Sequence, residues 1–177
     1  MQDEESLVRR AQQHDQMALT QLYEENFDRI YRYIVLKIGE KTEAEDMTQQ
    51  VFLNAFKSIS SYKYRGTPFS SWLFRIAHNQ IVDYLRRKSK RATVPLDESL
   101  ISGNSDPRLE VERNLDIRNL VLATKWLTKA QQEVISLRFA GELSIAQAAK
   151  IMGKSEGAIK ALQHSAIVSL RKALAAG

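Results

Sequence analysis

Aromatic rings and cations alternate in one short stretch of the sequence, residues 62–75. The stretch begins Tyr62-Lys63-Tyr64-Arg65 and continues with Phe69, Trp72, Phe74 and Arg75. Rings stack on unpaired bases while cations hold the phosphates, so this composition is typical of single-stranded nucleic-acid binding. The competing interpretation is that Trp72 and Phe74 belong to a hydrophobic core.

A second group of cations follows in the same segment. Residues 86–91 read Arg86-Arg87-Lys88-Ser89-Lys90-Arg91, five cations in six residues, and such a run can hold a phosphate backbone. Asn79 and Asp83 precede it one helical turn apart and can face a nucleic-acid strand or a neighbouring helix. For the basic run, the alternative is a solvated surface.

Residues 144–170 carry the pattern of a helix-turn-helix. Ser144 and Gln147 form a capping box, Gly153 suits a turn with positive φ, and Ser155 can cap the next helix. That helix would place its N-terminal end in the major groove of duplex DNA, so its outward residues should be small or polar. The residues that meet this requirement are Ser155, Glu156, Gly157, Lys160, Ala161, Gln163 and His164. The alternative interpretation is a three-helix domain without a DNA-binding role, because any such domain with a glycine turn can show this pattern by chance.

No residues show the spacing of a catalytic or metal-binding site. His14, His78 and His164 are scattered, and the chain has neither a Gly-rich phosphate loop nor a nucleophile elbow. Its lack of cysteine excludes a thiol nucleophile, a disulfide framework and Cys-ligated metal. Carboxylate pairs such as Glu24 and Glu25 are explained more simply as solvated faces. We therefore expect a binding protein, not an enzyme, with no cofactor and no metal.

Helical periodicity positions these residues. Apolar side chains recur at three- and four-residue spacings, most clearly over residues 7–38, 44–56, 72–87 and 128–170, and no alternating strand pattern occurs. Gly39 predicts a helix C-cap, while Thr42 with Glu45, and Thr128 with Gln131, predict helix starts through capping boxes. The fold class is predicted to be all-α.

Composition divides the chain into two predicted helical domains, residues 1–92 and 113–177, joined by a flexible acidic linker over 93–112. The net charge is +3 over residues 1–92, −3 over 93–115 and +5 over 116–177. The middle segment holds Pro95 and Pro107 with several Ser, Gly and Asn residues, a composition typical of linkers. A long loop within one domain is the alternative. The two basic blocks indicate a polyanionic partner more clearly than the total of +5 over 177 residues does.

The chain has no apolar run of the length that spans a bilayer, and its beginning, MQDEESLVRR, is unlike a signal peptide. We therefore expect a soluble cytosolic protein.

Three segments together resemble one family. Residues 44–52, AEDMTQQVF, resemble the core-polymerase-binding helix of bacterial sigma factors. Residues 72–87 look like the adjoining helix that melts the promoter and recognises the −10 element. Residues 127–139, 143–149 and 155–160 are similar to the domain that reads the −35 element. The short length points to the extracytoplasmic function (ECF) group. The resemblance implies that the chain binds the β and β′ subunits of core RNA polymerase and promoter DNA, and that it stays in the bacterial cytoplasm, where an anti-sigma factor can also hold it at the membrane.

The resemblance also implies three sets of site residues. Those near the polymerase clamp helices are Asp46, Gln49, Gln50 and Phe52. Those at the −10 element, where residues 62–69 capture a flipped base, are Tyr62, Tyr64, Arg65, Phe69, Trp72, Asn79, Asp83, Arg86 and Arg87. Those at the −35 element are Ser155, Glu156, Gly157, Lys160, Ala161 and His164.

This sequence departs from the family where members often carry cations: it has Leu162, Ser165 and Ile167 there. The departure implies fewer phosphate contacts from the −35 helix. The competing function is a stand-alone helix-turn-helix regulator whose N-terminal half senses a ligand or dimerises. Such a regulator would bind specific duplex DNA tightly without polymerase.

Overall fold

The computed structural model describes residues 3–65, 67–91 and 119–176. Every regular element within these ranges is helical and no strand occurs there, which confirms the predicted all-α class. The predicted linker, residues 93–112, lies outside the described residues.

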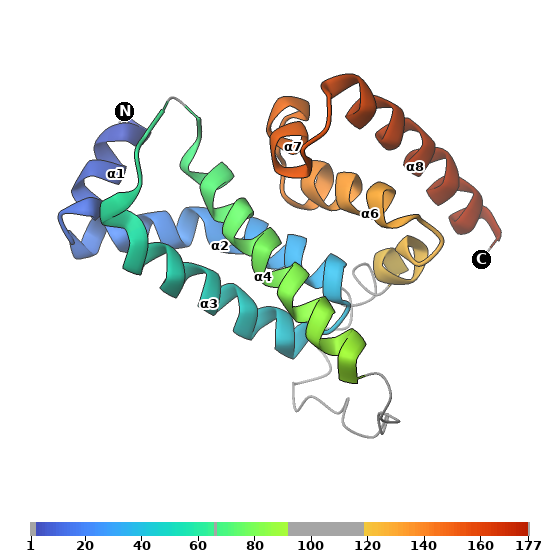
Figure 1. The fold of residues 1–177 in the computed structure, drawn as a ribbon, viewed down its shortest axis with the longest axis horizontal. Coiled ribbons are helices and arrows are strands. Elements are labelled where there is room, and N and C mark those ends of the chain that lie inside the picture. The colour runs from blue at the N-terminus through green and yellow to red at the C-terminus, as the bar shows by residue number, and fades with distance from the viewer. Residues whose placement is uncertain (1–2, 66, 92–118, 177) are drawn as a thin grey trace.

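The N-terminal half contains α1 (Glu4–Gln12), α2 (Gln16–Ile38), α3 (Lys41–Ser58), the 3-10 turn η1 (Ile59–Ser61) and α4 (Phe69–Arg91). Helix α2 packs against α1, α3 and α4, and Figure 1 shows α3 and α4 crossing beside it. Tyr33, Phe69 and Phe74 are among the largest fully buried side chains. This group of helices therefore positions the aromatic and basic residues of the stretches 62–75 and 86–91.

Local start and stop signals explain most helix boundaries in this half. Gly39 ends α2 at φ 73°, with its N–H donating to Val35 O at 2.9 Å, as predicted. The predicted cap at Thr42 is wrong, because α3 begins at Lys41 with Glu40 in the N-cap position. Gly39 turns the chain so abruptly that only one residue separates it from the start of α3. Helix α4 is longer than the apolar period of residues 72–87 indicates, since a basic C-terminal end favours continued helix.

The C-terminal half contains a helical segment over 119–124, then α6 (Lys129–Ile135), α7 (Ile145–Met152) and α8 (Glu156–Ala176). Both predicted capping boxes here are confirmed, at the start of α6 and at the start of α7. Gly153 has φ 63°, and Ser155 Oγ accepts from Ala158 N at 3.1 Å. Helices α7 and α8 pack together as the predicted helix-turn-helix. Of the three alanines of α7, Ala148 and Ala149 are buried, whereas Ala146 is exposed.

A π-helical turn, η3 (Ser136–Ala140), replaces the predicted continuation of α6. The wider turn rotates Phe139 away from the core, and its side chain is 56% exposed. It also directs Arg138 inward, where its guanidinium donates to Leu143 O at 2.6 Å and to Gln163 Oε1 at 2.8 Å. Gln163 is thereby engaged within the protein, although its position in the pattern suggested an outward side chain.

The two halves pack on each other in this structure. Helix α2 contacts η3, and α4 contacts α7, so that the C-terminal group of helices lies beside α2 and α4 (Figure 1). Buried residues of both halves, including Phe74 and Leu137, form one hydrophobic cluster.

Candidate nucleic-acid interface

Three aromatic rings gather at the start of α4. The ring centroids of Tyr62 and Trp72 are 4.7 Å apart, and Phe69 lies 5.5 Å from each. Phe69 is fully buried, whereas Tyr62 and Trp72 keep part of their surface exposed. Phe69 therefore supports the other two rings from the core, and only Tyr62 and Trp72 of this group can meet a base in this conformation.

Polar atoms without partners lie beside these rings. Tyr62 Oη and Ser71 Oγ are buried and have no hydrogen-bond partner among the described residues. Burial raises the pKa of the Tyr62 phenol, and the nearby Glu4 carboxylate raises it further. The phenol therefore stays protonated at neutral pH and keeps its hydrogen-bond donor.

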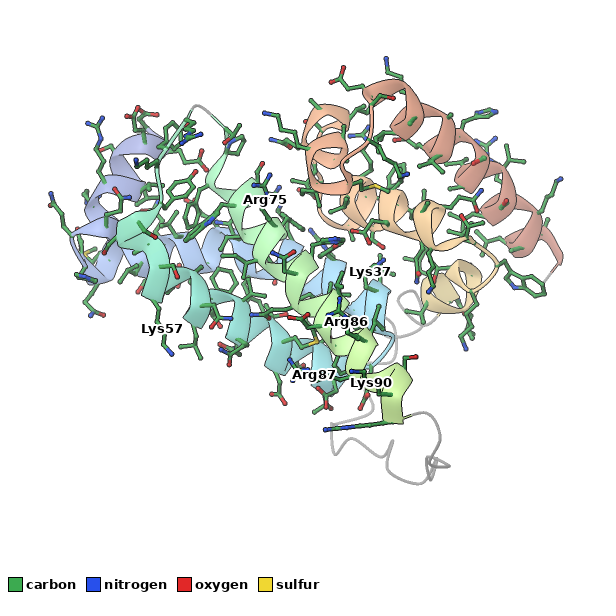
Figure 2. The ribbon with its side chains drawn as sticks, in the orientation of Figure 1. Lys37, Lys57, Arg75, Arg86, Arg87 and Lys90 are labelled. Atoms are coloured by element: carbon green, nitrogen blue, oxygen red, sulfur yellow. The ribbon has the colours of Figure 1, made fainter. Side chains whose placement is uncertain are left out.

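One face of α4 continues from the rings as a polar and basic stripe. Its members are Arg75, Asn79, Asp83, Arg86 and Lys90, which are all exposed and follow one another at spacings of three and four residues, on one side of the helix. Figure 2 shows Arg86, Arg87 and Lys90 gathered towards the C-terminal end of α4, with Arg75 nearer its start. A strand whose bases stack on the rings at the start of α4 could lay its phosphates along this stripe.

A different surface lies on α3. Asp46, Gln49 and Gln50 are exposed as predicted, while Phe52 is 2% exposed and packs edge-on against Tyr23 at 4.8 Å between ring centroids. Phe52 therefore shapes the helix from inside and is not available to a partner. Leu53 was missed by the sequence reasoning, although it is 54% exposed beside Gln49 and Gln50. The signal that could have identified Leu53 is that it is an apolar residue on the otherwise polar side of this helix.

The N-terminal end of α8 is open to solvent. The six residues predicted to meet duplex DNA are all exposed, namely Ser155, Glu156, Gly157, Lys160, Ala161 and His164. A Cβ added to Gly157 would meet only Ser155 Oγ, at 4.0 Å, so the backbone at this position can be approached closely. Helix starts of this kind also present free N–H groups to a phosphate.

Within residues 3–65, 67–91 and 119–176, no group of three or more His, Asp or Glu side chains could hold a metal ion. In the same part of the chain, no helix is long and apolar enough to cross a membrane.

Comparison with known proteins gives the same division of the chain. Residues 22–91 match the family model Sigma-70 region 2, and residues 125–172 match Sigma-70, region 4. The chain belongs to the sigma-70 family, in its ECF group. Helix α1 and residues 92–124 lie outside both matched regions.

Curated relatives agree with this placement. The ECF RNA polymerase sigma factor BldN of Streptomyces coelicolor is 38% identical over 170 residues, covering 95% of this chain and 64% of BldN. The chain thus spans just under two thirds of that relative's length. SigK of Mycobacterium tuberculosis is 26% identical over 177 residues, covering 97% of this chain and 94% of SigK.

Solved structures share the fold. CnrH, solved in complex with the cytosolic domain of CnrY, superposes with a TM-score of 0.74 at 21% identity, over 98% of this chain and 97% of that one. RpoE from Bartonella quintana, solved with the anti-sigma factor NepR, gives a TM-score of 0.70 at 22% identity, over 88% and 95%.

One buried carboxylate makes polar contacts between the two sigma regions of this chain. Glu133 on α6 is 6% exposed; its Oε1 accepts from Tyr33 Oη at 2.6 Å and lies 3.1 Å from His78 Nδ1. Its other oxygen pairs with Lys37 Nζ, a side chain labelled in Figure 2. All three partners belong to region 2. The sequence reasoning missed this cluster, because no periodic pattern connects an acid on α6 with helices α2 and α4.

The same partners set the protonation state of Glu133. Burial would raise the pKa of its carboxyl, but the hydrogen bond with His78 and the charge of Lys37 lower that pKa to about 2. Burial raises the pKa of the Tyr33 phenol well above its usual range, and the Glu133 charge raises it further. The carboxylate is therefore ionised and Tyr33 is neutral at every physiological pH.

A second set of contacts, made by Arg29 and Arg32 of α2, links the same two regions. Arg29 donates from Nε to Gly141 O at 3.0 Å, and its guanidinium lies 5.7 Å from the centroid of the Phe74 ring. Glu142 sits 3.8 Å from Arg29 and 3.5 Å from Arg32, largely exposed. A Cβ added to Gly141 would come within 2.8 Å of the Phe74 ring. The ring of one region therefore packs directly against the backbone of the other.

Proposed function

We propose that the chain acts as an ECF sigma factor: it binds core RNA polymerase through the β and β′ subunits, directs it to promoters and helps to open the DNA. The observation that carries this proposal is the presence of two separate exposed faces of the right chemistry on the two matched regions. One is the ring-and-cation face of α4, and the other is the small, polar start of α8. The chain acts by binding, with no covalent step.

In region 2, the proposed polymerase surface is Asp46, Gln49 and Gln50 on α3, with Leu53 as its apolar centre. Interfaces draw much of their affinity from a few apolar side chains surrounded by polar ones, which fits this arrangement. Phe52 and the aromatic side chains around it keep α3 in place from below.

The proposed −10 surface begins at Tyr62 and Trp72, whose exposed faces would stack against an unstacked base. Unstacking a base costs a few kcal/mol, which stacking on these rings and contacts with the phosphates offset. Phe69 takes part only by supporting the rings. The loop adds Tyr64 and Arg65 to this surface, and α4 supplies Asn79, Asp83, Arg86 and Arg87 to the non-template strand.

The proposed −35 surface is the N-terminal end of α8 in the major groove. Lys160 and His164 would reach base edges or phosphates. Ser155 and Glu156 stand at the helix start, and Gly157 and Ala161 allow close approach.

Reading both elements at once requires the two regions to separate. The elements lie about 25 base pairs apart, which is roughly 85 Å of duplex, whereas a compact chain of this length has a radius of gyration of about 16 Å. Residues 92–118 could extend to about 90–100 Å at most. The packed arrangement is therefore not the one that reads both elements. We infer that residues 1–92 and 113–177 act as two domains joined by the segment 93–112 once polymerase is bound.

Anti-sigma control is part of the proposal. Two proteins of the same fold were solved bound to partner proteins, CnrH with the cytosolic domain of CnrY and the sigma factor RpoE with the anti-sigma factor NepR. We infer a comparable partner for this chain, which would act in the cytoplasm and, where the partner is a membrane protein, at the membrane.

Leu53 gives a direct test of the proposed polymerase surface. Replacing Leu53 with aspartate is expected to weaken binding to core polymerase on the order of tenfold or more, because a charge would enter the apolar centre of the interface. Fluorescence anisotropy of labelled chain titrated with core enzyme measures the effect.

The matched control is Met17→Asp, since Met17 is an apolar residue 77% exposed near the start of a different helix, α2. This variant should bind core polymerase like the unmodified chain. Equal losses in both variants, or none in either, would contradict the assignment of α3, and failure of the unmodified chain to bind core enzyme would contradict the proposed function itself.

A further inference from the structure

Helix α1 lies outside the matched sigma regions, yet it contacts the start of the proposed base-capturing loop. Gln12, the last residue of α1, donates from Nε2 to Ile59 O at 3.0 Å and to Tyr62 O at 2.6 Å. A carboxamide has two N–H donors, and both are directed at carbonyls of this segment. One side chain thus fixes the point where the chain leaves η1 and enters the loop.

The other end of the same helix contacts the far end of the loop. Glu4 Oε1, in the first turn of α1, accepts from Phe69 N at 3.2 Å. Phe69 is the first residue of α4, so its N–H has no partner within the helix and is satisfied by Glu4. An acidic side chain is also favourable at the positive end of a helix dipole.

Glu4 also contacts the loop between these two ends. Burial raises the pKa of the Tyr64 phenol, and a hydrogen bond with Glu4 and the charges of neighbouring acids raise it further. Tyr64 therefore stays neutral beside the Glu4 carboxylate.

Helix α1 is itself firmly anchored. Leu7, Val8 and Ala11 are buried at 3%, 1% and 0% exposure, and the helix packs against α2 and η1. Its two polar side chains, Glu4 in the first turn and Gln12 at the last residue, are therefore held on a rigid helix. Their combined effect is to set the distance and orientation between Tyr62 and Phe69.

We propose that α1 is a clamp that fixes the shape of residues 62–65 and 67–69, and that Gln12 and Glu4 are positioning residues for single-stranded DNA selection at the −10 element. This inference rests on the proposed function of that loop. Neither residue needs to touch DNA. Each acts through the backbone of a residue that carries, or directly supports, a stacking ring.

The test uses complete chain bound to core polymerase and a randomised single-stranded DNA library, from which the bound sequences are read. Gln12→Ala should reduce affinity for the sequences preferred by the unmodified complex about three- to tenfold and flatten the base preference, because Tyr62 loses its fixed position. Glu4→Ala should act similarly, while Glu4→Gln, which keeps an acceptor oxygen, should retain most of the preference. Binding to core polymerase should not change in any of these variants.

Two controls separate positioning from simple loss of stability. Gln13→Ala removes an exposed glutamine next to Gln12 and should leave the preference unchanged. Val8→Ala weakens the packing of α1 without removing either polar contact, so it should lower the thermal midpoint but keep the preference.

An unchanged preference in Gln12→Ala and Glu4→Ala, with a clear preference in the unmodified complex, would overturn the inference and leave the proposed function intact. A flattened preference in Val8→Ala equal to that in Gln12→Ala would also overturn it. If the unmodified complex had no preference, both the proposed function and this inference would fall.

Discussion

Replacing Glu133 with alanine is expected to separate the two sigma regions. The substitution leaves Lys37 buried without its counter-charge and removes the acceptor for Tyr33 Oη. Removing one partner of a buried ion pair typically costs about 3–5 kcal/mol, and here that cost falls on the packed arrangement, since all partners of Glu133 lie in the other region. Small-angle scattering should report a radius of gyration above the roughly 16 Å of a compact chain of this length.

Glu142→Ala is the matched control for that experiment. Glu142 lies in the same interface, but it is exposed and pairs with Arg29 and Arg32 only at 3.5–3.8 Å. Exposed pairs contribute about 0–1 kcal/mol, so this variant should stay packed. Equal compactness of Glu133→Ala and the unmodified chain would contradict the role given to Glu133. A Lys37→Met, Glu133→Leu double variant should regain packing, because no buried charge is then left unpaired.

The packing should also depend on acidity in one direction. The hydrogen bond with His78 and the charge of Lys37 outweigh burial and lower the pKa of Glu133 from 4.5 to about 2. Its contribution of roughly 3 kcal/mol is therefore complete above about pH 4.5 and disappears as the pH falls towards 2. The free energy that holds the two regions together should therefore fall in the unmodified chain as the pH is lowered from about 4.5 towards 2. The Glu133→Ala variant should not show this fall.

Separation has a consequence for polymerase binding. If the packed arrangement competes with the bound one, the affinity for core enzyme is reduced by the fraction of chain that is open. Glu133→Ala should therefore bind core polymerase more tightly than the unmodified chain. Weaker binding by a variant whose two regions remain folded would contradict the requirement for separation.

Reversing the charge of Arg86 is expected to weaken promoter complexes strongly. Arg86 is exposed in the basic end of α4, and Arg86→Glu would replace attraction to a phosphate with repulsion. We expect affinity to fall on the order of tenfold or more near physiological salt, and the salt dependence to become shallower by roughly 0.7–0.9 for each phosphate that the protein no longer neutralises. Filter binding of the polymerase complex to promoter DNA over a range of salt concentrations measures both.

Lys57→Glu is the control for Arg86→Glu. It makes the same change in net charge, but Lys57 stands on α3 well away from the basic end of α4 (Figure 2). Its salt slope and affinity should remain close to those of the unmodified complex. Similar effects of the two substitutions would mean that net charge, and not the face of α4, accounts for DNA binding.

The sequence was sufficient for most helices because local signals determine them, and the order of the two regions followed from the resemblance to sigma factors. Gly39, Gly153 and the capping boxes at Thr128 and Ser144 all act within a few residues of their own position. The exposed faces of α4 and α8 followed from the same periodicity.

What could not be predicted depends on contacts between distant residues. Phe52 and Phe69 were predicted to be site residues, but both are buried, and Phe52 packs against Tyr23 of the preceding helix. Glu133 meets Tyr33 across 100 residues, and Gln12 meets Tyr62 across 50. The π-turn at Ser136–Ala140 exposes Phe139 against its apolar pattern. None of these features has a period that a sequence can display.

The most direct test of the central claim is to map the 5′ ends of RNA made on fragmented genomic DNA of the source organism by core polymerase with and without this chain. The proposed function predicts new start sites that require the chain and share two upstream elements at a fixed spacing. The Lys160→Ala variant should relax the upstream element, and Asn79→Ala should relax the one nearer the start. An identical set of start sites with and without the chain would contradict the proposal that it directs polymerase to promoters.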